Sequence, residues 1–344
     1  MKMKTLVALS GGVDSSVAAA MLIDQGHDVT GVTLRLWGGD TDSGCCSVGD
    51  VEDARRVAAQ LGIPHYVFNL TEQFGESVVG PYVEAHAAGR TPNPCVECNR
   101  SIKFGVLFER AQVLGFDAVA TGHHARVERD AGGRFRLHRG RDTAKDQSYV
   151  LYMLGQRELA RTLLPIGELT KPEVRAHATR LGLRTAAKAE SMDVCFVARD
   201  ARRQFLDDRA PTPPGTVVDT GGRVLGRHSG IAHFTVGQRR GLGVAAGERR
   251  YVVDVDPVSA VVTIGRREDL LRCELRVRDL VWVDQPIDAG RDVAIQVRAH
   301  GEPMVGHLDG RDRVVLHEPQ PRVAPGQVVA FYDGDTLMGG GIAA

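Results

Sequence analysis

The chain has 344 residues, with 43 Lys and Arg against 43 Asp and Glu, so its formal net charge is zero. Balanced charge argues against a generic polyanion-binding protein, and the length allows two or three domains with separate cores. No apolar stretch approaches the ~20 residues of a membrane span, and no signal peptide opens the chain, so we expect a cytoplasmic protein without membrane contact. In such a reducing compartment, the six cysteines favour catalysis or metal binding over structural disulfides.

The first elements are a strand, a loop and a helix. Residues 5–9 form an apolar run typical of a buried strand, and residues 17–23 form an alanine-rich helix that ends near Gly26. Such a loop collects backbone N–H groups and the positive end of the helix dipole, which favours an anion. It has neither a Walker A lysine nor GxGxxG spacing. It is similar to the pyrophosphate loop of enzymes that split ATP between its α and β phosphates, and it reads Ser10-Gly11-Gly12-Val13-Asp14-Ser15.

Residues 1–197 continue to alternate strand-like and helix-like segments. A helix over residues 51–61 is expected to be capped by Asp50, and a capping box at Thr170 opens another helix that runs to Gly182. The alternation predicts an α/β domain with a doubly wound parallel sheet, helices on both faces and ligands at the carboxyl ends of the strands. The remaining strands are expected at residues 29–36, 63–70 and 116–121.

The pattern changes near residue 200 to short β-branched runs separated by Gly, Asp and Pro. Several short strands at this spacing predict a small barrel or sandwich. This part is also rich in arginine, including Arg239 and Arg240, which allows a local basic face. We therefore divide the chain into an ATP-binding catalytic domain (1–197), a small central domain (198–270) and a C-terminal β-barrel-like domain (271–344).

Two cysteines stand at CxxC spacing after a proline-rich segment. Residues 89–94 predict an extended loop that delivers Cys95 and Cys98 just before a helix that begins near Ser101. A third thiol, Cys195, lies close to the end of the α/β region. A zinc site would need two further ligands at suitable spacing, so we expect no metal site and favour catalytic thiols.

A set of motifs covers nearly the whole chain and resembles one known family. The motifs follow one another in the order of the bacterial tRNA-specific 2-thiouridylase family, and as a set they are specific although each alone is not. Besides the loop at residues 10–16, they are Thr91-Pro92-Asn93-Pro94 with Cys98-Asn99 and Ile102-Lys103-Phe104, Thr121-Gly122-His123, Lys145-Asp146-Gln147-Ser148-Tyr149, Cys195-Phe196, Gly237-Gln238-Arg239-Arg240-Gly241-Leu242-Gly243 and a terminal Gly-Gly-Gly-Ile.

The resemblance implies an enzyme that converts the wobble uridine of certain tRNAs to 2-thiouridine. It implies that ATP adenylates the C2 oxygen, that pyrophosphate leaves into the loop at residues 10–15, and that sulfur then replaces AMP. By the same resemblance, Cys195 carries a persulfide and Cys98 assists as nucleophile, ending as a transient Cys98–Cys195 disulfide. The implied cofactors are ATP and Mg²⁺, and the implied partners are tRNA and a cysteine desulfurase or sulfur-carrier protein as persulfide donor.

Further site residues follow from the resemblance alone. Many members of the family have aspartate at the position of Cys95, so this chain departs from the family pattern there. The implied ATP-binding positions are Ala8, Leu9, Ser10, Gly11, Gly12, Val13, Asp14, Ser15, Leu34 and Gly122. The implied positions that meet tRNA or its target base are Asn93, Pro94, Cys95, His123, Lys145, Asp146, Gln147 and Gln327.

Three alternative interpretations stay open. A different ATP pyrophosphatase, such as an amidotransferase-type synthetase or an amino-acid ligase, would use the same loop but leave the thiols without a role. An iron–sulfur tRNA thiolase would use Cys95, Cys98 and Cys195 as cluster ligands, and we favour the metal-free persulfide route over it. A non-enzymatic RNA-binding scaffold would leave the ATP loop unexplained.

Overall fold

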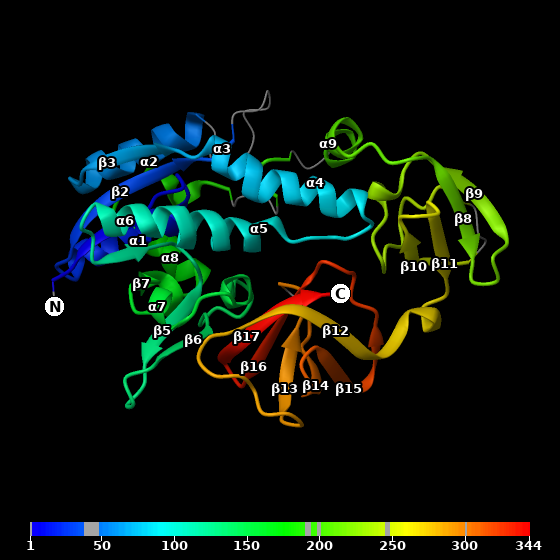
Figure 1. Cartoon of the computed structure of the whole chain (residues 1–344). Coiled ribbons are helices and arrows are strands. Elements are labelled where there is room, and N and C mark those ends of the chain that lie inside the picture. Colours follow the sequence, from blue (N-terminus) through cyan, green and yellow to red (C-terminus); the bar gives the residue numbers. More distant parts are fainter. Residues whose placement is uncertain (1, 38–47, 190–193, 198–200, 245–247, 300) are drawn as a thin grey trace.

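The structure, a computed structural model, describes residues 2–37, 48–189, 194–197, 201–244, 248–299 and 301–344. Its N-terminal part is built on a five-stranded parallel sheet in the order β3–β2–β1–β4–β7 (Figure 1). The order reverses between β1 and β4, and ligands of open α/β sheets bind outside the carboxyl ends of the strands at such a point. The strands are β1 (Lys4–Ala8), β2 (Asp28–Arg35), β3 (His65–Asn69), β4 (Ala118–Ala120) and β7 (Thr162–Leu163).

Helices cover both faces of this sheet, as the sequence predicts. Along β1, Val7 packs with the α1 and α2 side, whereas Leu6 packs with the side formed by α3 to α6. The helices of this part are α1 (Val13–Asp24), α2 (Val48–Leu61), α3 (Thr71–Phe74), η1 (Gly75–Val79), α4 (Gly80–Ala87), α5 (Pro94–Glu97), η2 (Cys98–Val106), α6 (Leu107–Val113), α7 (Gln156–Leu159) and α8 (Lys171–Arg180). Short 3₁₀ turns lie at η3 (Ser148–Leu151), η4 (Pro165–Glu168) and η5 (Arg184–Ala187).

Two expected helix starts need correction. Asp50 lies in the first turn of α2, which begins at Val48, so Asp50 is not the residue before the helix. The helical segment that carries the CxxC cysteines begins at Pro94 rather than near Ser101. The capping box at Thr170 is confirmed, because Glu173 accepts a hydrogen bond from the Thr170 backbone N–H at 2.7 Å.

A small four-stranded sheet follows α9 (Arg202–Arg209) in the order β10–β11–β8–β9. Its core is aliphatic and includes the completely buried side chains of Val217, Val252, Val262 and Ile264. The strands are β8 (Gly215–Asp219), β9 (Val224–His228), β10 (Tyr251–Asp256) and β11 (Val261–Gly265), with short 3₁₀ turns at η6 (Ile231–His233) and η7 (Glu268–Leu270).

The C-terminal part is a closed six-stranded barrel (Figure 1). Its order is β12–β15–β14–β13–β16–β17, and pairing of β12 with β17 closes it. Gly340 in β17 permits close packing, since a Cβ there would lie 2.6 Å from the Val329 carbonyl oxygen and 2.8 Å from the Tyr152 ring. The strands are β12 (Leu271–Trp282), β13 (Asp292–Gln296), β14 (Met304–Asp309), β15 (Arg313–Pro321), β16 (Val328–Asp333) and β17 (Thr336–Ala343).

A hairpin from the N-terminal part extends the barrel sheet. It consists of β5 (Ala125–Arg129) and β6 (Phe135–Arg139), and β6 pairs with β17 through Leu137 and Leu337. Both leucines are almost completely buried. The N-terminal part therefore contributes two strands to the sheet of the barrel, while its own parallel sheet remains separate. In the described part of the chain, no helix is both long enough and apolar enough to cross a membrane.

Candidate active site

Hydrogen bonds of serine residues within it stabilise the loop between β1 and α1. The Ser10 backbone N–H donates to Ser15 Oγ at 3.1 Å, and Ser16 Oγ donates to the Gly12 carbonyl at 2.8 Å. Gly12 precedes α1 in an extended conformation and has no side chain to cap the helix. The first N–H groups of α1 therefore remain available to a ligand in the loop, which suits an anion such as phosphate.

Two glycines allow close backbone contacts around this loop. Gly11 has φ +72°, and a Cβ there would lie 2.3 Å from the Asp50 carbonyl oxygen in α2. Gly122 follows β4, and a Cβ there would lie 2.6 Å from the Ser15 backbone nitrogen. The segments after β1 and β4 thus touch at the point where the strand order reverses. The predicted ATP positions Ala8 to Ser15 and Gly122 come together there, whereas Leu34 is buried in β2.

Asp14 carries a negative charge at the start of α1. Lys171 Nζ donates to both carboxylate oxygens, at 2.8 and 2.7 Å, and His124 Nε2 lies 3.4 Å from Oδ1. Burial raises the pKa of Asp14, but the hydrogen bonds with His124 and Lys171 outweigh it and hold the pKa below the ordinary value. Asp14 is therefore an ionised carboxylate beside the loop.

Lys188, which precedes Cys195 in the chain, contacts both the loop at Gly11 and helix α2. Its Nζ donates to the Gly11 carbonyl at 3.0 Å and to the Asp50 and Asp53 carboxylates at 2.7 Å each. Burial lowers the pKa of Lys188, but the two carboxylates outweigh it and raise the pKa above the ordinary value. A charged lysine thus connects α2, the loop and the chain that precedes the third cysteine.

Replacing Lys188 should remove a contact that holds the loop at Gly11 in place, without removing a group expected to bind ATP itself. We expect Lys188→Met to raise the KM for ATP by roughly tenfold and to destabilise the protein by about 1–3 kcal/mol, because two carboxylates and one carbonyl lose a charged donor. Lys188→Arg should restore part of the ATP affinity. The checks are steady-state pyrophosphate release and thermal unfolding, with exposed Lys2→Met as the control. An unchanged KM in Lys188→Met would contradict this role.

The CxxC cysteines lie inside a helical segment and not in a loop ahead of it. Asn93 caps α5 by accepting a hydrogen bond from the Cys95 backbone N–H at 3.0 Å, and Pro94 occupies the first helical position. Cys95 falls in the first turn and is half-buried, and Cys98 begins η2 and is buried. The Asn93 amide also donates to Tyr149 Oη at 3.3 Å, which fixes the cap against the segment at residues 145–149.

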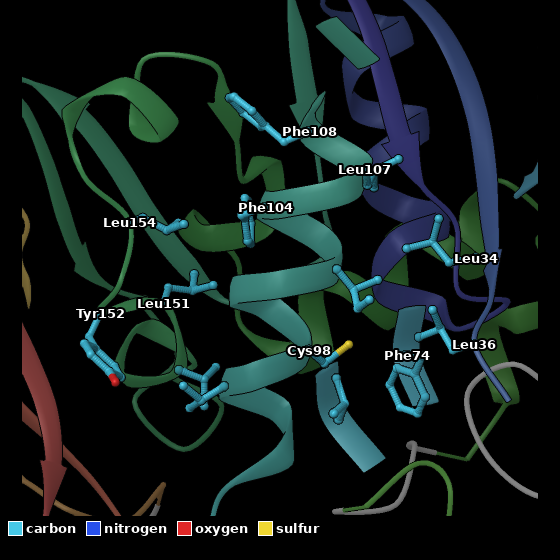
Figure 2. Packing of buried hydrophobic residues seen from close by; sticks show 14 of the residues in the cluster. Leu34, Leu36, Phe74, Cys98, Phe104, Leu107, Phe108, Leu151, Tyr152 and Leu154 are labelled. Carbon is cyan, nitrogen blue, oxygen red and sulfur yellow. The ribbon is translucent and has the colours of Figure 1, made fainter. Parts of the chain in front are cut away.

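Cys98 and Cys195 belong to the same apolar cluster. Figure 2 shows the Cys98 side chain on the side of its helix that faces Leu36 and Phe74. Phe196, directly after Cys195, is 2% exposed, and its ring centroid lies 5.6 Å from that of Phe74. Phe196 therefore anchors the Cys195 segment against the same phenylalanine that borders Cys98.

The other predicted RNA positions lie around this pair of segments. Gln147 accepts a hydrogen bond from the His124 backbone N–H at 3.0 Å, and Lys145 is half-buried. Asp146 is 4% exposed, and its carboxylate accepts a hydrogen bond from Arg139 Nη1 at 2.9 Å. This carboxylate therefore makes its contact inside the protein. His123 is 7% exposed, and burial together with nearby cationic groups holds its pKa well below the ordinary value.

Gln327 connects the barrel to Thr91, which lies just before the helical segment of the cysteines. Its side-chain amide donates to the Thr91 carbonyl at 2.6 Å, and the Thr91 backbone N–H donates to the Pro325 carbonyl at 2.7 Å. Thr91 Oγ1 also lies 3.1 Å from Thr235 Oγ1 of the central part. The segment that leads to Cys95 is therefore held by both β parts of the chain.

Sequence reasoning missed three residues beside the loop: His124, Lys171 and Lys188. In the sequence, Lys171 lies within the capping box that opens α8, and a capping box carries no information about a distant ion pair. Its partner Asp14 lies 157 positions earlier in the chain. His124 directly follows the Thr121-Gly122-His123 motif, but Lys188 belongs to no motif, and no local periodicity signals the contacts of either residue.

The fold and the loop define a class of protein, a nucleotide-binding α/β domain of the HUP type with two β domains attached. Residues 3–199 match the tRNA methyl transferase HUP domain, residues 203–266 the tRNA methyl transferase PRC-barrel domain, and residues 272–343 the aminomethyltransferase beta-barrel domain. The chain is 51% identical to the tRNA-specific 2-thiouridylase MnmA of Chloroflexus aggregans, over 98% of this chain and 97% of that protein. It is 47% identical to the protein of the same name from Moorella thermoacetica, over 98% of each.

The chain belongs to the tRNA-specific 2-thiouridylase family. Solved structures overlap only in part. A 4-thiouridine synthetase–RNA complex with bound ATP gives a TM-score of 0.38 at 20% identity, covering 61% of this chain and 50% of that one. A U34-tRNA thiolase NcsA from Methanococcus maripaludis with its [4Fe-4S] cluster gives 0.37 at 18% identity, covering 60% and 65%.

Proposed function

We propose that this chain is an ATP-dependent enzyme that replaces the C2 oxygen of the wobble uridine in tRNA with sulfur. Family membership supports tRNA uridine thiolation. The single observation that carries the mechanism is the combination of an anion loop at the end of β1 with two thiols, Cys98 and Cys195, in one apolar cluster. A different ATP pyrophosphatase would share the loop, but it would have no use for these thiols.

The loop would serve the activation step. The uridine C2 oxygen attacks the α-phosphorus of ATP, the bond to the β-phosphate oxygen breaks, and pyrophosphate leaves toward the N–H groups of α1. Asp14 would hold Mg²⁺, because an ionised carboxylate is the oxygen ligand that this ion prefers, and the ion would neutralise charge on the phosphates. Lys171 donates to both Asp14 oxygens and, together with His124, keeps Asp14 ionised. Lys171 would also place beside the phosphates the cation that a Walker A loop carries itself.

The thiols would serve the substitution step. The outer sulfur of a Cys195 persulfide attacks C2 and expels AMP, which leaves C2 joined to Cys195 through a disulfide. The Cys98 thiolate then attacks the sulfur of Cys195, the thiocarbonyl forms, and a Cys98–Cys195 disulfide remains. An external dithiol supplies the two electrons and two protons that reduce this disulfide and itself becomes a disulfide. A persulfide donor, either a cysteine desulfurase or a sulfur-carrier protein, then reloads Cys195.

The tRNA would lie across the three parts of the chain. We propose that Asn93 and Cys95 meet the target base, that the buried Pro94 between them fixes the start of α5, and that Lys145, Gln147 and Gln327 contact the surrounding RNA. The buried His123 and Asp146 would act from behind this surface by positioning the segments that carry it. The α/β domain, proposed as residues 1–197, performs the chemistry. The domains proposed as 198–270 and 271–344 hold more distant phosphates.

The exposed arginines of the central domain test this placement. We expect Arg239→Glu and Arg240→Glu each to weaken tRNA binding and to lower the slope of log affinity against log salt by about one, as loss of a phosphate contact does. Pyrophosphate release from ATP at saturating tRNA should stay within about twofold of the unaltered protein. Exposed Arg55→Glu on α2 is the control. Equal salt slopes in all three variants would place these arginines outside the interface.

Anaerobic reconstitution tests the proposed reaction as a whole. The full chain is incubated with tRNA, ATP and a persulfide donor, and 2-thiouridine is measured together with protein-bound iron and acid-labile sulfide. We expect 2-thiouridine to form without stoichiometric iron. Activity that requires iron and sulfide would instead favour a cluster on Cys95, Cys98 and Cys195. Absence of 2-thiouridine under both conditions would reject the thiolation reaction.

A further inference from the structure

Three potential metal ligands lie together on the outer face of the barrel. Asp292, His307 and His317 come from the adjacent strands β13, β14 and β15 (Figure 1). The strand register pairs Asp292 directly with His307, and it pairs His307 with Val315, two positions before His317. Residues next to them in the strands face the barrel core instead: Val293, Leu308 and Leu316.

The ligand atoms are close enough to share one ion. His317 Nε2 lies 2.9 Å and His307 Nδ1 lies 3.9 Å from the same Asp292 oxygen, and the three ligand atoms all lie within 4.8 Å of one another. A tetrahedral ion with bonds of about 2.0–2.2 Å keeps its ligand atoms roughly 3.3–3.5 Å apart. The side chains of Asp292 and His317 are 60% and 44% exposed, so small rotations can reach this geometry without disturbing the core.

We propose that Asp292, His307 and His317 form a binding site for a divalent late transition-metal ion, with Zn²⁺ as the best fit. Two imidazoles and one carboxylate are the ligand types that Zn²⁺ prefers, whereas Mg²⁺ favours an all-oxygen shell. Three protein ligands leave one coordination position for water or another small donor. No sequence motif predicts this set, because its members come from three separate strands.

The bound ion would connect three neighbouring strands of the barrel. Those strands lie in a different domain from β1, α1 and the cysteine segments (Figure 1). The site is therefore independent of the proposed thiolation chemistry, and its first effect is on the stability of the barrel. A ligand that binds only the folded state stabilises it in proportion to its occupancy.

Cobalt titration of the full-length protein, stripped of metal with EDTA, tests the site. We expect one equivalent of Co²⁺ to bind with visible d–d bands, without the near-ultraviolet band of thiolate coordination, and Zn²⁺ to displace it. His307→Ala and His317→Ala should each weaken Co²⁺ binding by at least about tenfold, because loss of a supporting partner alone costs roughly 10–100-fold. Zn²⁺ should also raise the unfolding temperature of the unaltered protein more than that of either variant.

The matched control is His177→Ala, which removes a half-buried histidine of α8 that contacts Arg180. It should bind Co²⁺ as the unaltered protein does. Equal Co²⁺ affinity in His317→Ala and the unaltered protein would overturn the site, as would binding seen only with thiolate bands. Absence of Co²⁺ binding would also overturn it and leave His317 and Asp292 as a surface hydrogen-bonded pair.

Discussion

Gly11→Ala is expected to lower ATP-dependent pyrophosphate release by roughly 10²–10³-fold, the effect of losing preorganised donors at a developing charge. Gly11 has φ +72°, and its added Cβ would lie 2.3 Å from the Asp50 carbonyl oxygen, so the loop must shift away from α2. Its N–H groups would then no longer converge on the phosphates. The measurement is pyrophosphate release with saturating tRNA.

Gly26→Ala is the matched control for this experiment. Gly26 also has a positive φ, of +84°, but no atom lies within 4 Å of an added Cβ. It therefore carries the same kind of backbone strain at a site away from the loop, and its pyrophosphate release should stay within about threefold of the unaltered protein, because strain there costs stability rather than ligand contacts. We expect tRNA binding to survive in both variants. Normal pyrophosphate release by Gly11→Ala would remove the basis for placing ATP at this loop.

Cys195→Ser is expected to abolish 2-thiouridine formation, a loss of roughly 10³-fold or more, as for removal of an essential nucleophile. It should still release pyrophosphate in the presence of tRNA, because activation uses the loop and not this thiol. Cys98→Ser should accept a persulfide on Cys195 but fail to release the thiolated base. Mass spectrometry of tRNA nucleosides and of cysteine-containing peptides measures both steps.

Cys273→Ser provides the control, since Cys273 is an exposed cysteine in β12. It should thiolate tRNA normally. When reductant is withheld, a Cys98–Cys195 linked peptide should accumulate in the unaltered protein, which requires the two Cα atoms to come within ~4.4–6.8 Å of each other. Thiolation by Cys195→Ser, or a persulfide carried on another cysteine instead, would contradict the assignment.

The sequence predicted the ATP-binding half of the fold well because its signals are local. One strand–loop–helix unit contains the apolar run of β1, the small residues of the loop and the alanines of α1. The capping box at Thr170 is sufficient by itself to predict the start of α8. The start of α5 was missed although Asn93 and Pro94 are strong signals for a helix start. Two prolines in a short segment predict a loop, but Pro94 occupies the first helical turn of α5.

The contacts that join distant segments could not be predicted from local patterns. The β5–β6 hairpin extends a sheet whose other strands lie far downstream, and a short hairpin sequence does not show which strand it will pair with. The same holds for the Lys171–Asp14 and Lys188–Asp50 ion pairs, because each partner alone is an ordinary charged residue. The geometry around the loop is therefore determined by tertiary packing that single-sequence patterns do not encode.

The most direct test of the proposed reaction follows the oxygen that sulfur replaces. A tRNA labelled with ¹⁸O at C2 of the wobble uridine is thiolated by the full chain with ATP and a persulfide donor, and the nucleotide products are analysed by mass spectrometry. We expect one AMP for each 2-thiouridine, with the ¹⁸O in the AMP phosphate, because adenylation makes that oxygen part of the leaving group. Label released into water, or formation of ADP and inorganic phosphate, would contradict adenylation at C2.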